Sequence, residues 1–167
     1  MIKYVSFFLT VLLTVPAFAA SMPTEIGEYG DWTAYSYKEG KNTVCYMAST
    51  PKKDEGKYKT RGEIYAVVTH RPADKSYNVV NFVAGYPYKN NSKVIVKIGT
   101  TTFNNLFTNG DNAWAPDSTT DKKLVDAMKR GQRMIVEGTS ARGTKTKDTY
   151  SLSGFSGAYR AISAKCK

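Results

Sequence analysis

The pattern of apolar and polar positions favours short β-strands over long helices. Apolar and polar residues alternate along many short stretches, and clusters of Gly, Pro, Asn and Asp separate those stretches. Residues 32–37 and 43–49 flank the turn-forming sequence at 39–42 and predict a hairpin that places Trp32 near Cys45. The stretches that predict strands are 32–37, 43–49, 61–70, 78–86, 93–98, 101–108, 113–115, 132–139 and 148–152.

Some stretches indicate where a strand lies in the sheet. Residues 78–86 are apolar without a break, which predicts a central strand covered on both faces. Residues 93–98 alternate lysine and apolar side chains, which predicts one face in water. Residues 21–29 and 51–59 show no alternation, and we interpret them as a loosely held lead-in and a charged loop.

Two segments have the helical period. Residues 121–130 place Leu124, Val125 and Met128 on one stripe, with a cap expected among residues 118–120 and an end at Gly131. A second helix is expected after Ser153 as its cap, with a buried side that leads to Cys166 and consists of Phe155, Ala158, Tyr159 and Ile162. The predicted fold is mainly β: a β-sandwich of about eight antiparallel strands with two short helices.

Residues 1–19 have the pattern of a secretory signal peptide. Lys3 precedes an apolar run at 5–15, which Pro16 ends, and Ala17-Phe18-Ala19 supplies small residues for cleavage after Ala19. An uncleaved anchor is the alternative. We therefore expect one domain over residues 20–167, without a transmembrane segment. The expected location is the periplasm, with outer-membrane association or secretion left open.

Export changes the meaning of the two cysteines. An oxidising compartment favours their pairing, so a disulfide between Cys45 and Cys166 is expected. The alternative is a nucleophilic Cys45 with His70 as its base.

Charge is the next feature that bears on function. The chain of 167 residues has 24 Lys and Arg against 14 Asp and Glu, a net charge of +10, and it would be +9 without residues 1–19. The basic residues are scattered and are not interleaved with base-stacking aromatics, so no nucleic-acid partner is expected. The charge indicates either a solvated cationic surface or attraction to an anionic envelope or host-surface polymer, and a protein partner stays open. With one His and two Cys, neither a metal site nor another cofactor is expected.

Seven residues are candidates for ligand binding, and the five basic ones among them fall in or beside predicted loops, where side chains from different strands converge. His70 and Arg71 lie at the end of a predicted strand. They would either bind an anionic ligand there or form only a structural turn. Trp114 would form an aromatic platform for carbohydrate or belong to the core, and the same choice applies to Trp32. The candidates are Lys52, Lys53, Lys57, His70, Arg71, Trp114 and Arg142. Residues 138–144 lack the features of a phosphate-binding loop and are interpreted as a hairpin.

Six ordered segments resemble the invasion-associated locus B family, and the resemblance covers the chain from about residue 29 to residue 166. They are Asp31-Trp32-Thr33-Ala34-Tyr35, Val44-Cys45-Tyr46-Met47, Val68-Thr69-His70-Arg71-Pro72, Ala113-Trp114-Ala115, Gly138-Thr139-Ser140-Ala141-Arg142-Gly143-Thr144 and Tyr150-Ser151-Leu152-Ser153-Gly154-Phe155-Ser156-Gly157-Ala158-Tyr159. The chain departs from the family in having no cysteine between Trp32 and Cys45, so the family's disulfide pattern is not carried over.

The resemblance implies an exported alphaproteobacterial protein with a β-sandwich fold. The family takes its name from a pathogen's member that contributes to invasion of red blood cells, and it has no agreed enzymatic activity. We therefore expect a non-enzymatic binding or accessory role at the envelope or host surface. The competing hypothesis is an envelope hydrolase that uses His70 with a Ser or Cys45 nucleophile.

Overall fold

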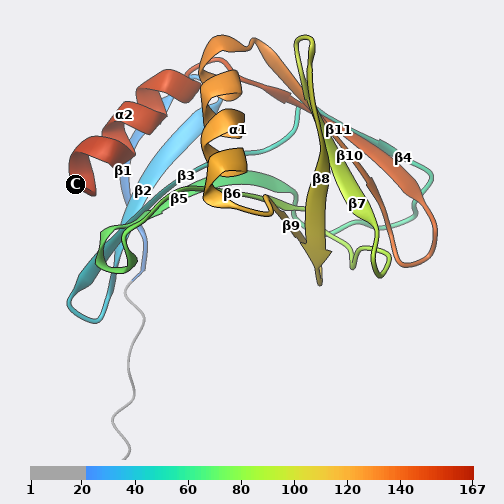
Figure 1. Ribbon diagram of the computed structural model, residues 1–167, viewed down its shortest axis with the longest axis horizontal. Helices are drawn as coiled ribbons and strands as arrows, with labels where there is room; N and C mark the ends of the chain where they lie inside the picture. The colour runs from blue at the N-terminus through green and yellow to red at the C-terminus, as the bar shows by residue number, and fades with distance from the viewer. Residues whose placement is uncertain (1–21) are drawn as a thin grey trace, which may run out of the picture.

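The computed structural model describes residues 22–167, so the expected signal peptide lies outside the described residues. These residues form strands, one 3-10 helix and two α-helices (Figure 1). In chain order they are β1 (Thr24–Tyr29), β2 (Trp32–Glu39), β3 (Asn42–Ser49), β4 (Lys53–Gly56), β5 (Tyr65–Arg71), η1 (Pro72–Asp74), β6 (Ser76–Val83), β7 (Lys93–Ile98), β8 (Thr101–Asn109), β9 (Asn112–Trp114), α1 (Ser118–Arg130), β10 (Arg133–Thr139), β11 (Lys145–Ser151) and α2 (Phe155–Lys165).

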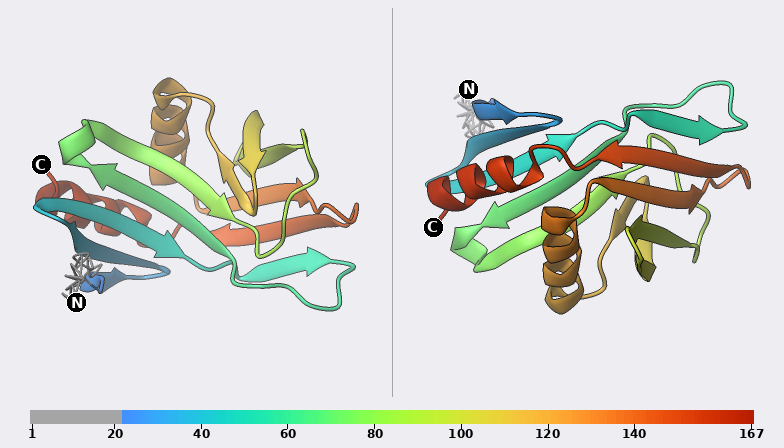
Figure 2. Two further views of the ribbon diagram at one scale, coloured as in Figure 1. Left: turned by 90° about the horizontal axis from the view of Figure 1, so that it is seen from below. Right: turned by 90° about the horizontal axis from the view of Figure 1, so that it is seen from above.

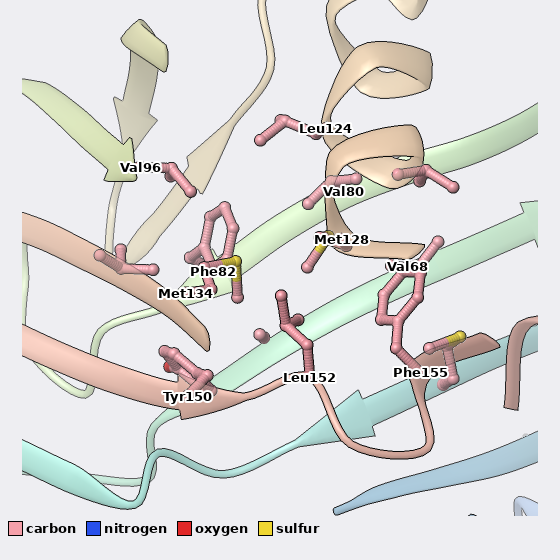
Figure 3. Packing of buried hydrophobic residues seen from close by; sticks show 14 of the residues in the cluster. Val68, Val80, Phe82, Val96, Leu124, Met128, Met134, Tyr150, Leu152 and Phe155 are labelled. Atoms are coloured by element: carbon pink, nitrogen blue, oxygen red, sulfur yellow. The ribbon is translucent and has the colours of Figure 1, made fainter. Parts of the chain in front are cut away.

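All strands belong to one antiparallel sheet of 11 strands in the order β1-β2-β3-β5-β6-β9-β8-β7-β10-β11-β4. The predicted antiparallel, mainly β class is confirmed, with 11 strands where about eight were expected. The sheet is strongly curved, so that β10 and β11 face β5 and β6 across the core (Figures 1 and 3). The two layers expected of a sandwich are therefore parts of one continuous sheet.

The two strands that the sequence pattern did not predict, β1 and β4, are the two edges of the sheet. The expected lead-in at 21–29 contains β1, and the expected charged loop at 51–59 contains β4, so both interpretations were wrong there. All four residues of β4 are exposed, and the strand is held by its pairing with β11. An edge strand without a buried face has no reason to alternate apolar and polar residues, and charge on it discourages further pairing.

The core fills the concave side of the sheet. Side chains from β5, β6, β10, β11 and both helices meet there (Figure 3). Trp32 is fully buried; its indole nitrogen donates to the Ser151 carbonyl at 3.0 Å, and its ring meets Phe155 edge-on with centroids 4.9 Å apart. The interpretation of Trp32 as a core residue is therefore confirmed.

The two helices cover the concave side, α1 against β6 and α2 across β1, β2 and β3. Both caps differ from the expected ones. Asp117 caps α1: its side chain reaches forward to the first turn and accepts from the otherwise free amide of Thr120 at 2.7 Å. Gly154, not Ser153, caps α2 with φ of 85°, and a Cβ there would come within 1.7 Å of the Tyr29 carbonyl oxygen.

Candidate anion-binding site

Three connections meet at one end of the sheet, away from α2. They are residues 57–64 between β4 and β5, residues 84–92 between β6 and β7, and residues 140–144 between β10 and β11. Figure 2 shows the β10–β11 hairpin and β4 reaching toward this end while the C-terminus lies at the other. Backbone bonds join the three: Gly62 N donates to Gly85 O at 2.9 Å and Ala141 N to Pro87 O at 2.8 Å. We call this region the basic end.

Two hollows lie side by side at the basic end and share four lining residues, Lys57, Arg142, Thr144 and Thr146. The outer hollow, of about 1000 Å³, lies over β4, β7, β10 and β11. The tyrosine hollow, of about 670 Å³, is more enclosed and lies between residues 57–62, 85–87 and 140–146. Lys57 and Arg142 therefore stand where the two hollows meet.

Positive charge dominates both hollows. Lys93, Lys145 and Lys147 also line the outer hollow, and its two acids are each paired with a lysine, Glu137 with Lys97 at 2.8 Å and Glu55 with Lys147 at 3.6 Å. Lys59 and Arg61 also line the tyrosine hollow; among the described residues its lining has no Asp or Glu, and Asp148 balances the charge of Arg61 alone. Such a distribution attracts anions into both hollows.

Arg61 forms the floor between Tyr58 and Tyr86. It makes two hydrogen bonds of 2.6 Å to the Asp148 carboxylate, and its Nε donates to the Ala84 carbonyl at 2.7 Å. Burial alone lowers the pKa of Arg61, but the hydrogen bonds and charge of Asp148 outweigh it, so the pKa lies above its usual range. The rings of Tyr86 and Tyr58 lie 5.0 and 5.4 Å from its guanidinium carbon. Arg61 thus joins the 57–64 connection to β11.

A tight turn presents Arg142 to solvent. Within the turn, Gly143 N donates to the Ser140 carbonyl at 2.8 Å, and Thr144 N donates to Ser140 Oγ at 3.1 Å. The turn follows β10 and precedes β11, as the interpretation of residues 138–144 as a hairpin required. Gly138 leaves room for the tyrosines below, because a Cβ there would come within 2.9 Å of Tyr86 Oη.

The five basic candidates differ in their surroundings in the structure. Lys57 and Arg142 converge at the basic end, and no ion pair engages either one within residues 22–167. Lys53 is exposed on β4. Lys52 pairs with Asp31, and Arg71 pairs with Glu39 at 2.6 Å, so both are engaged elsewhere.

Seven further basic or aromatic residues of the two hollows were not singled out in sequence: Tyr58, Lys59, Arg61, Tyr86, Lys93, Lys145 and Lys147. In the sequence, Lys93 begins a predicted strand with one face in water, Lys145 falls in a polar turn, and Tyr86 ends an apolar run. Their convergence depends on the pairing of β7 with β10 and of β10 with β11, which no local spacing reveals.

His70, a candidate for anion binding and for catalysis, is buried and 2% exposed. Nδ1 lies 3.1 Å from the Asn78 amide nitrogen, which can only donate, and 3.1 Å from the Thr69 carbonyl oxygen, which can only accept, so the two contacts call for opposite tautomers. Nε2 lies 3.1 Å from Ser163 Oγ, and the tautomer decides which of the two atoms donates. Because the His70 ring is buried and lies outside both hollows, the described residues leave no open path for a substrate to this His–Ser contact.

The burial of His70 predicts a pH dependence of stability. Burial lowers the pKa of His70 below its usual 6.5, the Thr69 carbonyl opposes that shift, and Lys129 adds to it. Below pH 6.5 the unfolded chain therefore takes up a proton that the folded chain resists, and stability falls as the pH falls. Asp121, whose pKa burial raises to about 6, has the opposite effect between pH 3.8 and 6.

The difference between wild type and His70→Asn isolates the His70 contribution. Urea unfolding from pH 8 to pH 5 should give a steeper loss of stability below pH 6.5 for wild type than for the variant. The asparagine amide oxygen can still accept from the Asn78 amide, so the variant should fold. If the stability of the two proteins depends on pH in the same way, the pKa of His70 is the same in the folded and unfolded states.

Trp114 is half-buried on β9 and lies outside both hollows. Its cross-strand partners are Asn81 on β6 and Phe107 on β8, and Phe107 is 42% exposed. Phe107 in turn pairs with Lys93, which lines the outer hollow. Trp114 therefore lies opposite Phe107 in the sheet and does not line the hollows.

Cys45 on β3 and Cys166 after α2 form a disulfide, with Cα atoms 6.0 Å apart. Cys45 lies opposite His70 in the pairing of β3 with β5. A sulfur in a disulfide has no thiolate to offer as a nucleophile. Cys45 is thus a structural residue in this state.

No helix within residues 22–167 is long and apolar enough to cross a membrane, and that part of the chain has no group of His, Cys, Asp and Glu arranged for a metal ion. No curated protein and no solved structure matches the chain. One family model, described as Invasion associated locus B (IalB) protein, matches residues 32–163, which include every strand from β2 onward and most of α2. Because the match covers most of the sequence, the chain belongs to the invasion associated locus B family.

Proposed function

We propose that this protein is an exported, non-enzymatic protein whose basic end binds an anionic polymer of the cell envelope or a host surface. The observation that carries the proposal is the position of Lys57 and Arg142, unpaired within the described residues, between two cationic hollows. Both project from connections tied together by backbone hydrogen bonds, so binding need not order them first.

Export is supported by the signal-peptide pattern at residues 1–19 and by the disulfide. We place the protein in the periplasm, at the outer membrane or outside the cell. The hydrolase alternative has less support, because His70 is buried and lies outside both hollows, and Cys45 is in the disulfide.

The test measures binding of the residue 20–167 protein to fluorescent polygalacturonate and poly-glutamate at increasing salt. Affinity should fall about tenfold or more between 50 and 300 mM NaCl, since salt screens exposed charges over about 8 Å at physiological strength. The variant Lys57→Glu/Arg142→Glu should lose about tenfold in affinity at 50 mM NaCl, because both charges are reversed at the binding site.

The matched control is Lys41→Glu/Arg160→Glu, which changes net charge equally on the exposed β2–β3 turn and on α2. It should bind within about twofold of wild type if the basic end is the site. Equal losses in both variants would show a diffuse response to net charge. No binding of wild type to either polymer would refute the proposed function.

A further inference from the structure

We propose that the tyrosine hollow binds one anionic sugar unit, with Tyr58 and Tyr86 against the sugar ring and Lys57, Lys59 and Arg142 around its acidic group. This inference rests on the proposed function, because it assigns a place within the basic end to one unit of the polymer. The rest of the polymer would follow the outer hollow, which shares Lys57 and Arg142.

The two tyrosine rings are held in place. Tyr58 Oη donates to Asp54 Oδ2 at 2.9 Å, and Tyr86 Oη is hydrogen-bonded to Thr146 Oγ1. The guanidinium of Arg61 lies against both rings and is itself fixed by Asp148. Aromatic rings with a fixed orientation offer an apolar face to a ligand at little entropic cost. A sugar ring, apolar on its C–H face and polar at its edge, suits such a surface.

The charges select an acidic sugar over a neutral one. Lys57, Lys59 and Arg142 line the tyrosine hollow, and none has an ion pair within residues 22–167. Its volume of about 670 Å³ falls in the range of small-ligand sites, about 300–1000 Å³. The outer hollow has no aromatic side chain and has two acids, so it lacks the combination of ring and unopposed charge.

The experiment compares Tyr58→Ala with Tyr58→Phe, using tri-galacturonate, neutral galactotriose, glucosamine 6-phosphate and a blocked tri-glutamate peptide. Tri-galacturonate and tri-glutamate carry the same number of carboxylates, so the number of charges does not distinguish them, whereas only tri-galacturonate has sugar rings. Wild type should bind tri-galacturonate more tightly than tri-glutamate and galactotriose. Tyr58→Ala should lose about five- to tenfold for tri-galacturonate, and Tyr58→Phe should stay within about twofold.

Binding of tri-glutamate should not weaken in Tyr58→Ala, because removal of the ring uncovers part of the Arg61 guanidinium. Tyr77→Ala, which removes an exposed tyrosine outside both hollows, is the matched control and should leave all affinities unchanged. Melting curves of each variant check that the fold persists. If Tyr58→Ala weakens the binding of glucosamine 6-phosphate as well as that of tri-galacturonate, the ligand class extends from uronic acids to the phosphorylated sugars of lipid headgroups.

Two results would overturn the inference while leaving the proposed function intact. One is equal affinity of wild type for tri-galacturonate and tri-glutamate with no effect of Tyr58→Ala. The other is galactotriose binding as tight as that of tri-galacturonate, since the charges would then select nothing. Failure of wild type to bind polygalacturonate or poly-glutamate would instead refute the proposed function, and the inference with it.

Discussion

Replacement of Arg61 by Met should destabilise the protein by about 3–5 kcal/mol, since it leaves the Asp148 carboxylate buried without its partner. The two side chains are 3% and 6% exposed, so water cannot replace the lost hydrogen bonds. The Ala84 carbonyl also loses its donor. Urea unfolding at pH 7 measures the loss, which corresponds to a fall in melting temperature of about 10 °C for a chain of this size.

The double variant Arg61→Met/Asp148→Leu is the control. It removes both charges, and buried ion pairs replaced by apolar side chains of similar volume often lose little stability. Most of the loss should therefore be recovered. A single variant that loses less than about 1 kcal/mol would show that Asp148 is solvated or protonated at little cost, and that Arg61 does not tie residues 57–64 to β11.

Removal of the Cys45–Cys166 disulfide should have the other large effect. The bridge joins residues 121 positions apart. In the chain-entropy model, closing a loop of that length raises the free energy of the unfolded state by at most about 4–5 kcal/mol. Reduction, or the variant Cys45→Ala/Cys166→Ala, should lower the melting temperature by several degrees, up to about 10 °C or more. The bridge also fastens the end of α2 to β3, so hydrogen exchange should increase in α2 before the core strands.

Thiol titration provides the direct check. Protein purified from the periplasm should have no reactive thiol in denaturant until reductant is added. Two reactive thiols without reductant would contradict the disulfide and would restore Cys45 as a candidate nucleophile.

Much of the fold could be predicted from sequence because its determinants are local. The β2–β3 hairpin, the wet face of β7 and the stripe of α1 each follow from periodicity and turn residues within a few positions. The expectation of a disulfide also needed only the number of cysteines and an export signal. Family membership was likewise visible in ordered segments of sequence.

The candidate site was only partly predictable. Loop positions singled out Lys57 and Arg142, which the structure brings together, but the same argument chose Lys52 and Arg71, which it pairs with acids. An exposed lysine has the same local signature whether its partner is water, an acid or another lysine. Only the order of strands in the sheet decides which of these it meets.

The sequence by itself determined the class of the fold, the central strands and helices, and the signs of export, because each rests on residues close together in the chain. Only the tertiary structure decided that β1 and β4 are edge strands, that His70 is buried, and that Arg61 meets Asp148. Those contacts join residues far apart in sequence, and Arg61 and Asp148 are 87 positions apart. The free energy of such contacts depends on burial and register, which exist only when the sheet has formed.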